Sequence, residues 1–197
     1  MANLNTPFGF GQYRGTGSSP TFEQVTARIS PTNTTPIYSG DAVAFATPAN
    51  GYIIQASAGT APVAGIFIGC KYLSVSQKRV VWGNYWPGSD ASGDVEAYVI
   101  NDPNAQFLVQ AGGAAIGRDK IGQNVQLNPG VGNAFTGRSG MYVENPAATA
   151  TLPFRIISVV TTPPGANGTD LSSPYNLVVV GFNNAVTRNN GATPGIA

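Results

Sequence analysis

Histidine is missing from this chain, and its absence limits the chemistry that the other residues could perform. The 197 residues include no His and a single Cys. Nucleophile systems of the Ser-His-Asp and Cys-His types need an imidazole base, and common zinc sites need His or several Cys ligands. We therefore expect neither a hydrolase of these types nor a zinc site.

Paired carboxylates are the catalytic device that the composition leaves open. A glycosidase needs two acids about 5–10 Å apart, and Asp94 and Glu96 stand on one face of an expected strand. Strand periodicity places such pairs on solvated faces by chance, and we interpret this pair in that way. Asp90 and Asp94 could also help to hold calcium, but the spacing of an EF-hand loop is absent. We expect no catalytic residue, metal or cofactor.

The lone cysteine and the glycines also favour structural roles. Cys70 lies between Gly69 and Lys71 in an apolar run, which predicts a small buried hydrophobe, since reactive thiols need exposed, electropositive surroundings. Neither the dinucleotide-binding glycine pattern nor the phosphate-binding loop pattern occurs. The glycines are better suited to turns and bulges.

Three aromatic residues close together offer a binding surface instead of a reaction. Trp82, Tyr85 and Trp86 could line a platform for a sugar, because aromatic rings stack on apolar sugar faces. Aromatic residues also dominate cores and subunit interfaces. We favour the core or an interface for these three side chains.

The elements that carry these residues are expected to be strands. Charged residues make up 10% of the chain, whereas Gly (25) and Pro (15) are abundant. Bursts of β-branched and aromatic residues between turn residues predict an all-β, antiparallel sandwich or barrel, with a jelly roll among the fitting arrangements. Residues 112–137 should be mostly loop with a short helix. The expected strands are 23–30, 41–46, 52–57, 63–73, 78–86, 94–100, 106–111, 125–127, 140–143, 152–162 and 175–183.

The chain divides into an extended N-terminal arm (1–21), one β domain (22–184) and a loose C-terminal tail (185–197). The arm carries four large apolar residues that are candidates for partner binding, but it could equally fold back onto its own domain. These candidates are Leu4, Phe8, Phe10 and Tyr13. The aromatic residues expected in the core are Phe67, Tyr72, Trp82, Tyr98 and Phe107.

Charge and hydropathy narrow the range of partners. The net charge is +1, and the ten Lys and Arg residues are scattered, so the basic footprint of a nucleic-acid-binding protein is absent. No window is apolar enough to predict a membrane span or a signal peptide. We expect a protein that is made and folded in a cytoplasm.

Several segments of the sequence resemble a family of tailed-bacteriophage capsid decoration (cement) proteins. The resemblance spans most of the chain, and its motifs are structural. The segments that carry it are Asn5-Thr-Pro-Phe-Gly-Phe10, Gly65-Ile-Phe-Ile-Gly-Cys-Lys-Tyr72, Asn84-Tyr-Trp-Pro87, Ala97-Tyr-Val-Ile-Asn-Asp-Pro-Asn-Ala-Gln-Phe107, Gly122-Gln-Asn124, Leu152-Pro-Phe-Arg-Ile156 and Tyr175-Asn-Leu-Val-Val179.

The resemblance implies a β-rich structural virion protein without enzymatic activity or cofactor. Its partners would be the major capsid protein and further copies of itself, with a homotrimer favoured over a homodimer, on the capsid exterior after assembly in the host cytoplasm. The arm, residues 2–13, would reach onto a neighbour. The alternative is a carbohydrate-binding module for host recognition on the virion surface or tail.

Overall fold

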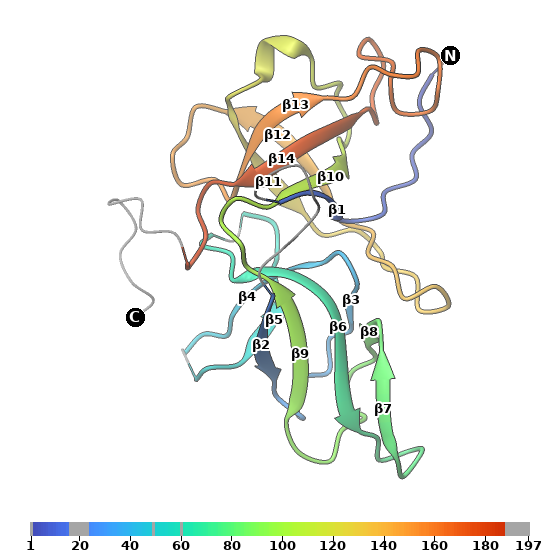
Figure 1. Cartoon of the computed structure of the whole chain (residues 1–197), viewed down its shortest axis with the longest axis vertical. Helices are drawn as coiled ribbons and strands as arrows, with labels where there is room; N and C mark the ends of the chain where they lie inside the picture. Colours follow the sequence, from blue (N-terminus) through green and yellow to red (C-terminus); the bar gives the residue numbers. More distant parts are fainter. Residues whose placement is uncertain (1, 16–23, 49, 60, 188–197) are drawn as a thin grey trace.

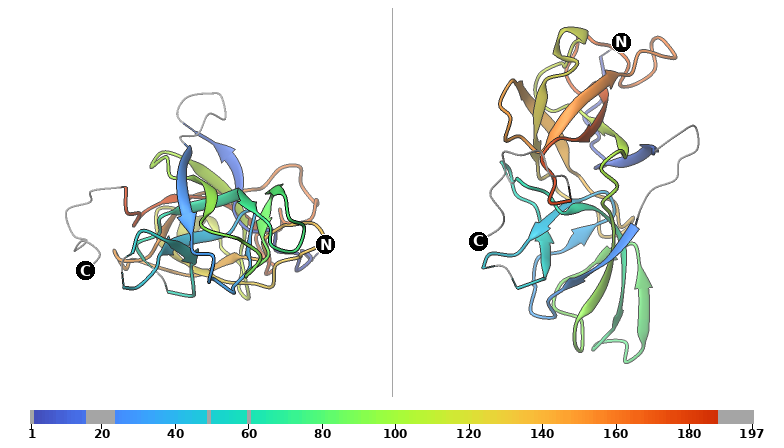
Figure 2. Two further views of the ribbon diagram at one scale, coloured as in Figure 1. Left: turned by 90° about the horizontal axis from the view of Figure 1, so that it is seen from below. Right: turned by 60° about the vertical axis from the view of Figure 1, so that its left-hand side comes forward.

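Short strands separated by turns fill the described part of the chain, as the bursts of β-branched and aromatic residues predict. The computed structural model describes residues 2–15, 24–48, 50–59 and 61–187. Two six-stranded antiparallel sheets lie one above the other along the long axis (Figures 1 and 2). The predicted all-β antiparallel fold is thus confirmed, in its sandwich form.

The lower sheet is built from the first half of the chain. Its strand order is β2-β9-β6-β4-β5. β4 pairs with the beginning of β6, and β7 pairs with the end of β6, at residues 70–73. A short ladder of β3 and β8 packs beside it. The bounds are β2 (Gln24–Ile29), β3 (Ile37–Tyr38), β4 (Ala42–Phe45), β5 (Ile53–Gln55), β6 (Gly65–Leu73), β7 (Val80–Gly83), β8 (Tyr85–Trp86) and β9 (Val95–Ile100).

The upper sheet combines the second half of the chain with the N-terminal arm. Its order is β1-β10-β14-β13-β11-β12, so the arm supplies an edge strand. One 3-10 turn, η1 (Arg118–Lys120), is the short helix expected between residues 112 and 137. The strands are β1 (Gly11–Arg14), β10 (Gln106–Gln110), β11 (Asn124–Asn128), β12 (Tyr142–Ala147), β13 (Phe154–Val159) and β14 (Leu177–Phe182).

Alternation of side chains sets which face of each lower strand is buried. In β2 the outward residues are Gln24, Thr26 and Arg28, and the intervening residues face inward. The full register with β9 pairs Arg28 with Glu96 and Ala27 with Ala97. Charged side chains therefore line one face of the sheet and small apolar ones the other.

Each sheet has its own apolar core, and the lower strands contribute to both. Phe67, Trp86 and Val99 lie in the lower cluster, whereas Ile66 and Ile100 belong to the upper cluster. Consecutive residues at the end of β6 and β9 thus point into different cores. This sharing joins the two sheets through side-chain packing.

Main-chain contacts join the sheets at a second place, which we call the junction. It consists of residues 9–10 of the arm, 39–40 of the lower half and 137–139 of the upper half. Its hydrogen bonds run from Phe10 N to Gly40 O (2.9 Å), from Ser39 N to Gly137 O (3.0 Å) and from Ser139 N to Ser39 O (2.9 Å). Three segments far apart in the sequence therefore meet there.

Glycine is required at the junction because the backbones touch. A Cβ on Gly9 would overlap the Ser139 side chain and the Gly40 carbonyl, and Gly9 has a φ of +77°. Few residues other than glycine adopt this conformation without strain. The arm can approach the lower sheet only because position 9 has no side chain.

Four expectations from the sequence need correction. Trp82 is 65% exposed, not in the core, because β7 is an edge strand and Trp82 points to the uncovered face. Tyr98, also expected in the core, is only partly buried, because its ring lies on the same face, parallel to Trp82. The single strand expected at 78–86 is two strands, β7 and β8, which pair with different partners. Residues 185–187 pack onto the domain, since Val186 N donates to Val63 O (2.9 Å); residues 188–197 lie outside the described residues.

Truncation of Phe10 tests how far stability depends on the arm. The Phe10 ring stacks on Phe154 (centroids 4.4 Å apart) and meets the edge of Phe107 (6.3 Å). The variant Phe10→Ala should lose about 3–5 kcal/mol of unfolding free energy, because truncation leaves a cavity where a buried aromatic ring stood. Urea unfolding measures this loss. The control Leu4→Ala removes an exposed side chain and should change it by less than about 0.5 kcal/mol. Equal losses for the two variants would contradict the arrangement.

Candidate functional site

The four candidate residues of the arm have different surroundings. Phe10 is buried (2% exposed) in the upper core, and Phe8 is partly buried. Leu4 (63% exposed) and Tyr13 are exposed. Only Leu4 and Tyr13 thus present much of their apolar surface to a partner.

The described part of the arm folds back onto its own chain. Asn3 donates through Nδ2 to Asp170 O (2.8 Å) and accepts at Oδ1 from Gly168 N (2.8 Å). Gln110 accepts from Thr6 N (3.0 Å) and donates to Leu4 O (2.9 Å). Of the two alternatives that the sequence left open, docking on a partner or folding back onto its own domain, the described part of the arm adopts the second. Residues 1 and 16–23, which include the rest of the predicted arm, lie outside the described residues.

The carboxylates singled out in the sequence lie on the outer face of the lower sheet. Asp94 accepts from Tyr52 OH (2.8 Å) and pairs with Arg28 (3.3 Å). Glu96 accepts from Tyr98 OH (3.0 Å) and lies 3.9 Å from the Lys71 ammonium. Within the described ranges no group of three His, Cys, Asp or Glu side chains is placed to hold a metal.

Asp90 and Cys70 both support the local fold. Asp90 accepts from Ser74 Oγ (2.7 Å) and Ser76 N (2.9 Å), and these bonds fix the turn before β7. The bond from Ser74 is the main reason that the pKa of Asp90 is lowered.

Burial raises the pKa of Cys70 to about 12, so its thiol stays protonated at neutral pH. Its predicted place as a small buried residue is confirmed.

The aromatic trio of the sequence does not form one platform. Trp86 is fully buried, and Tyr85 stacks on Tyr38 (centroids 5.6 Å apart). Trp82 instead lies on the outer face, parallel to the Tyr98 ring (6.0 Å, 6°), with the Lys71 ammonium 4.9 Å from its centroid. A ring pair in which Trp82 is exposed and Tyr98 is partly buried, flanked by Lys71 and Glu96, therefore marks this face.

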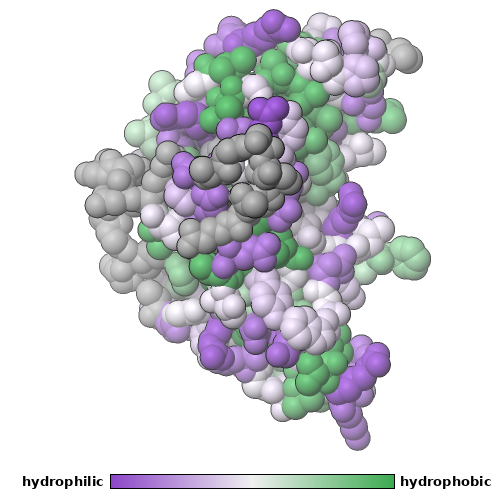
Figure 3. Space-filling view, viewed as in Figure 1, coloured by the Kyte–Doolittle hydropathy of each residue, from purple (hydrophilic) through white to green (hydrophobic). Residues whose placement is uncertain are grey.

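A second exposed apolar feature was missed by the sequence analysis. The connection between β11 and β12, residues 129–141, projects sideways from the molecule (Figure 1). Along it, Val131 (96% exposed) and Phe135 (99% exposed) present their side chains to solvent. The space-filling view shows hydrophobic side chains on this projection and a separate hydrophobic group at the end of the lower sheet (Figure 3). We call residues 129–138 the tip hairpin.

Hydrogen bonds close the end of the tip hairpin around Asn133. The Asn133 side chain accepts from Phe135 N (2.9 Å) and Thr136 N (3.2 Å). Its backbone N donates to Arg138 O (2.9 Å), and its carbonyl accepts from Gly137 N (2.8 Å). These bonds fix the backbone that presents Phe135.

The base of the tip hairpin is held by the lower half of the chain. Besides the junction, Asn84 Nδ2 donates to Thr136 O (2.9 Å). A Cβ on Gly132 would overlap the Tyr38 ring, and a Cβ on Gly130 would overlap the Gly140 carbonyl. Glycines at these positions allow the hairpin to pack closely while its tip points outward.

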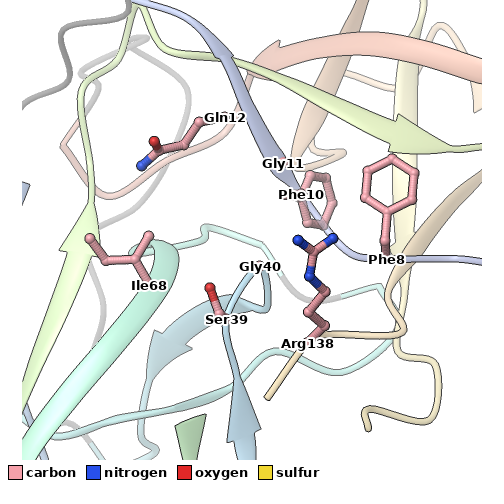
Figure 4. Close-up of a pocket in the computed structure, with 8 residues that line it drawn as sticks. All are labelled: Phe8, Phe10, Gly11, Gln12, Ser39, Gly40, Ile68 and Arg138. Carbon is pink, nitrogen blue, oxygen red and sulfur yellow. The ribbon is translucent and has the colours of Figure 1, made fainter. Parts of the chain in front are cut away.

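A pocket of about 300 Å³ opens beside the base of the tip hairpin. Phe8 and Phe10 of the arm, Gln12 of β1 and Ile68 of β6 form much of its lining (Figure 4). The Arg138 side chain extends from the hairpin toward the two phenylalanines (Figure 4). The pocket and the tip hairpin thus share Arg138.

The sequence offered only a weak signal for this site. Phe135 is the one aromatic residue of 112–137, a segment that the sequence predicts to be mostly loop. It stands among small and polar residues, as Phe10 does, and that composition alone does not distinguish a buried ring from an exposed one. The hydrogen bonds of Asn133 and Asn84 hold the backbone around it in place.

One buried carboxyl lies directly under the junction. Asp41 is buried, and its Oδ2 accepts from Tyr38 N (2.8 Å) and Gln55 Nε2 (2.8 Å). Burial raises the pKa of this carboxyl, while hydrogen bonds from Ser139, Tyr38 N and Gln55 partly oppose the rise. Asp41 is thus a titratable group that links β4 to the base of the tip hairpin.

The variant Asp41→Asn tests this link. Because the folded-state pKa is raised, the stabilisation from protonating Asp41 is complete below about pH 3.9 and is lost as the pH rises through the folded value. The unfolding free energy of the wild type minus that of the variant should therefore fall as the pH rises above about 4. Urea unfolding at several pH values measures it. All other acids are common to both proteins, so a constant difference would contradict the assignment.

No family model, no curated protein and no solved structure matches this chain. In the part of the chain that the structure describes, no helix is long and apolar enough to cross a membrane.

Proposed function

We propose that this chain is a capsid decoration protein, which binds the outer surface of an assembled phage head and stabilises contacts between capsomers. The observation that carries the proposal is the tip hairpin, where Phe135 stands 99% exposed on a fixed backbone. Aromatic residues are enriched in protein interfaces and often contribute a large share of the binding energy. The resemblance of the sequence to the decoration family implies the major capsid protein as the partner.

The physical mechanism of such a protein is mass action. A molecule that binds the assembled lattice but not free capsomers stabilises the lattice by its binding free energy. A head offers many equivalent sites, so a modest affinity per site adds up to a large total. The low charge of the chain, 10% charged residues, suits a surface that is covered in use.

Binding to heads that lack the protein tests the proposal. Purified chain should bind heads of the virus that encodes it at a fixed number of copies per head. It should also raise the temperature at which these heads release DNA, as followed by dye fluorescence. Bovine serum albumin at the same concentration is the control. Unchanged release, or no co-sedimentation with heads, would rule the function out.

A carbohydrate-binding module is the second candidate, and Trp82 favours it. Its exposed ring lies parallel to Tyr98, and such a pair gives a sugar an apolar surface to stack on. Glu96 and Lys71 beside the rings supply an acceptor and a donor for sugar hydroxyls. The same face would serve host recognition.

A glycan array decides between the two candidates. If this face binds a sugar, Trp82→Ala should abolish the signal, whereas Trp82→Phe, which keeps a ring, should retain part of it. Trp86→Ala is unsuitable because Trp86 is fully buried and its loss would destabilise the fold. Absence of any glycan signal for the wild type, or a signal unaffected by Trp82→Ala, would exclude this site.

A further inference from the structure

We propose that the tip hairpin and Arg138 form a two-part docking site for a protein surface that offers an apolar socket beside a carboxylate. The proposal deepens the proposed function, on which it rests, by naming the attachment element and the chemistry of its partner. It places attachment on the hairpin instead of the N-terminal arm.

The apolar part of the site is the end of the hairpin. From residue 129 to residue 137 the hairpin contains no charged residue, and Val131 and Phe135 are its two large side chains. Both are almost completely exposed, so a partner that enclosed them would remove most of their surface from water. Since the backbone is already fixed by Asn133, little loop entropy is lost on binding.

The charged part of the site is Arg138. Its side chain is exposed and makes no salt bridge within the described ranges, which is also true of Arg14, Lys78, Arg79, Arg118 and Arg155. Arg138 differs from these in lining the pocket beside the hairpin. The pocket that Arg138 lines includes no acidic residue. A carboxylate from a partner could form a bidentate pair with this guanidinium.

Charge also separates this partner from the two other possible occupants. A second copy of the chain docked through the same face would bring two Arg138 side chains together without an acid from the hairpin or the pocket lining to neutralise them. A lipid surface would meet one cation and two apolar side chains, and stable membrane attachment needs more than one weak signal. A protein surface with an acidic group fits both parts of the site.

Co-sedimentation of variants with heads that lack the protein tests the proposal. Phe135→Ala should weaken binding by about 30-fold or more, as expected for a central aromatic anchor. Arg138→Gln should weaken it about tenfold at about 0.1 M salt and much less at about 1 M salt, since salt screens an exposed ion pair. The matched controls, Ile121→Ala and Arg118→Gln beside or within η1, should bind as the wild type does.

The outcomes separate the two proposals. If the wild type does not bind heads, the proposed function fails. If the wild type binds and Phe135→Ala binds equally well, the docking site is wrong while the function stands. Flotation with phosphatidylglycerol vesicles that is lost in Phe135→Ala, together with unchanged binding to heads, would assign the hairpin to a membrane and overturn the proposal. Urea unfolding should show equal stability for Phe135→Ala and the wild type, because Phe135 packs against nothing.

Discussion

The close approach of three backbones at the junction is the constraint on which the rest of the structure depends. Main-chain hydrogen bonds there tie the arm, the lower sheet and the base of the tip hairpin to one another. Such contacts leave no room for a Cβ at Gly9, and they orient the segments more tightly than apolar packing alone would. The hairpin can project from the molecule and stay ordered because its base is held in this way.

The general fold could be predicted from the sequence because strand formation is largely local. Alternation in 24–29 sets strand faces that the structure retains, and the β-branched run at 177–182 forms a strand that is buried along almost its whole length. The sequence could not show which face of an edge strand remains uncovered, because Trp82 sits in the same alternating pattern as a core residue. That information depends on which strands pack above the sheet, which is a tertiary property.

The site was harder to predict for a related reason. Phe10 and Phe135 both stand among glycines and polar residues, yet one is buried and the other exposed. Phe10 is buried because β1 pairs with β10 and delivers the ring between Phe107 and Phe154. Phe135 is exposed because the turn around Asn133 directs it away from both sheets. Long-range pairing decides between the two outcomes, and local composition does not record it.

The packing of the arm onto its own domain also affects how the chain would bind a partner. A free arm with four apolar residues would lose much conformational entropy when it docked on a partner. In the folded chain the arm has already been ordered, and it forms both one wall of the Arg138 pocket and one side of the junction. The entropy cost of ordering the arm is therefore met during folding, and the tip hairpin can bind as a rigid element. In the proposed docking, a chain with few charges and a rigid apolar projection would gain affinity through preorganisation more than through long-range electrostatic attraction.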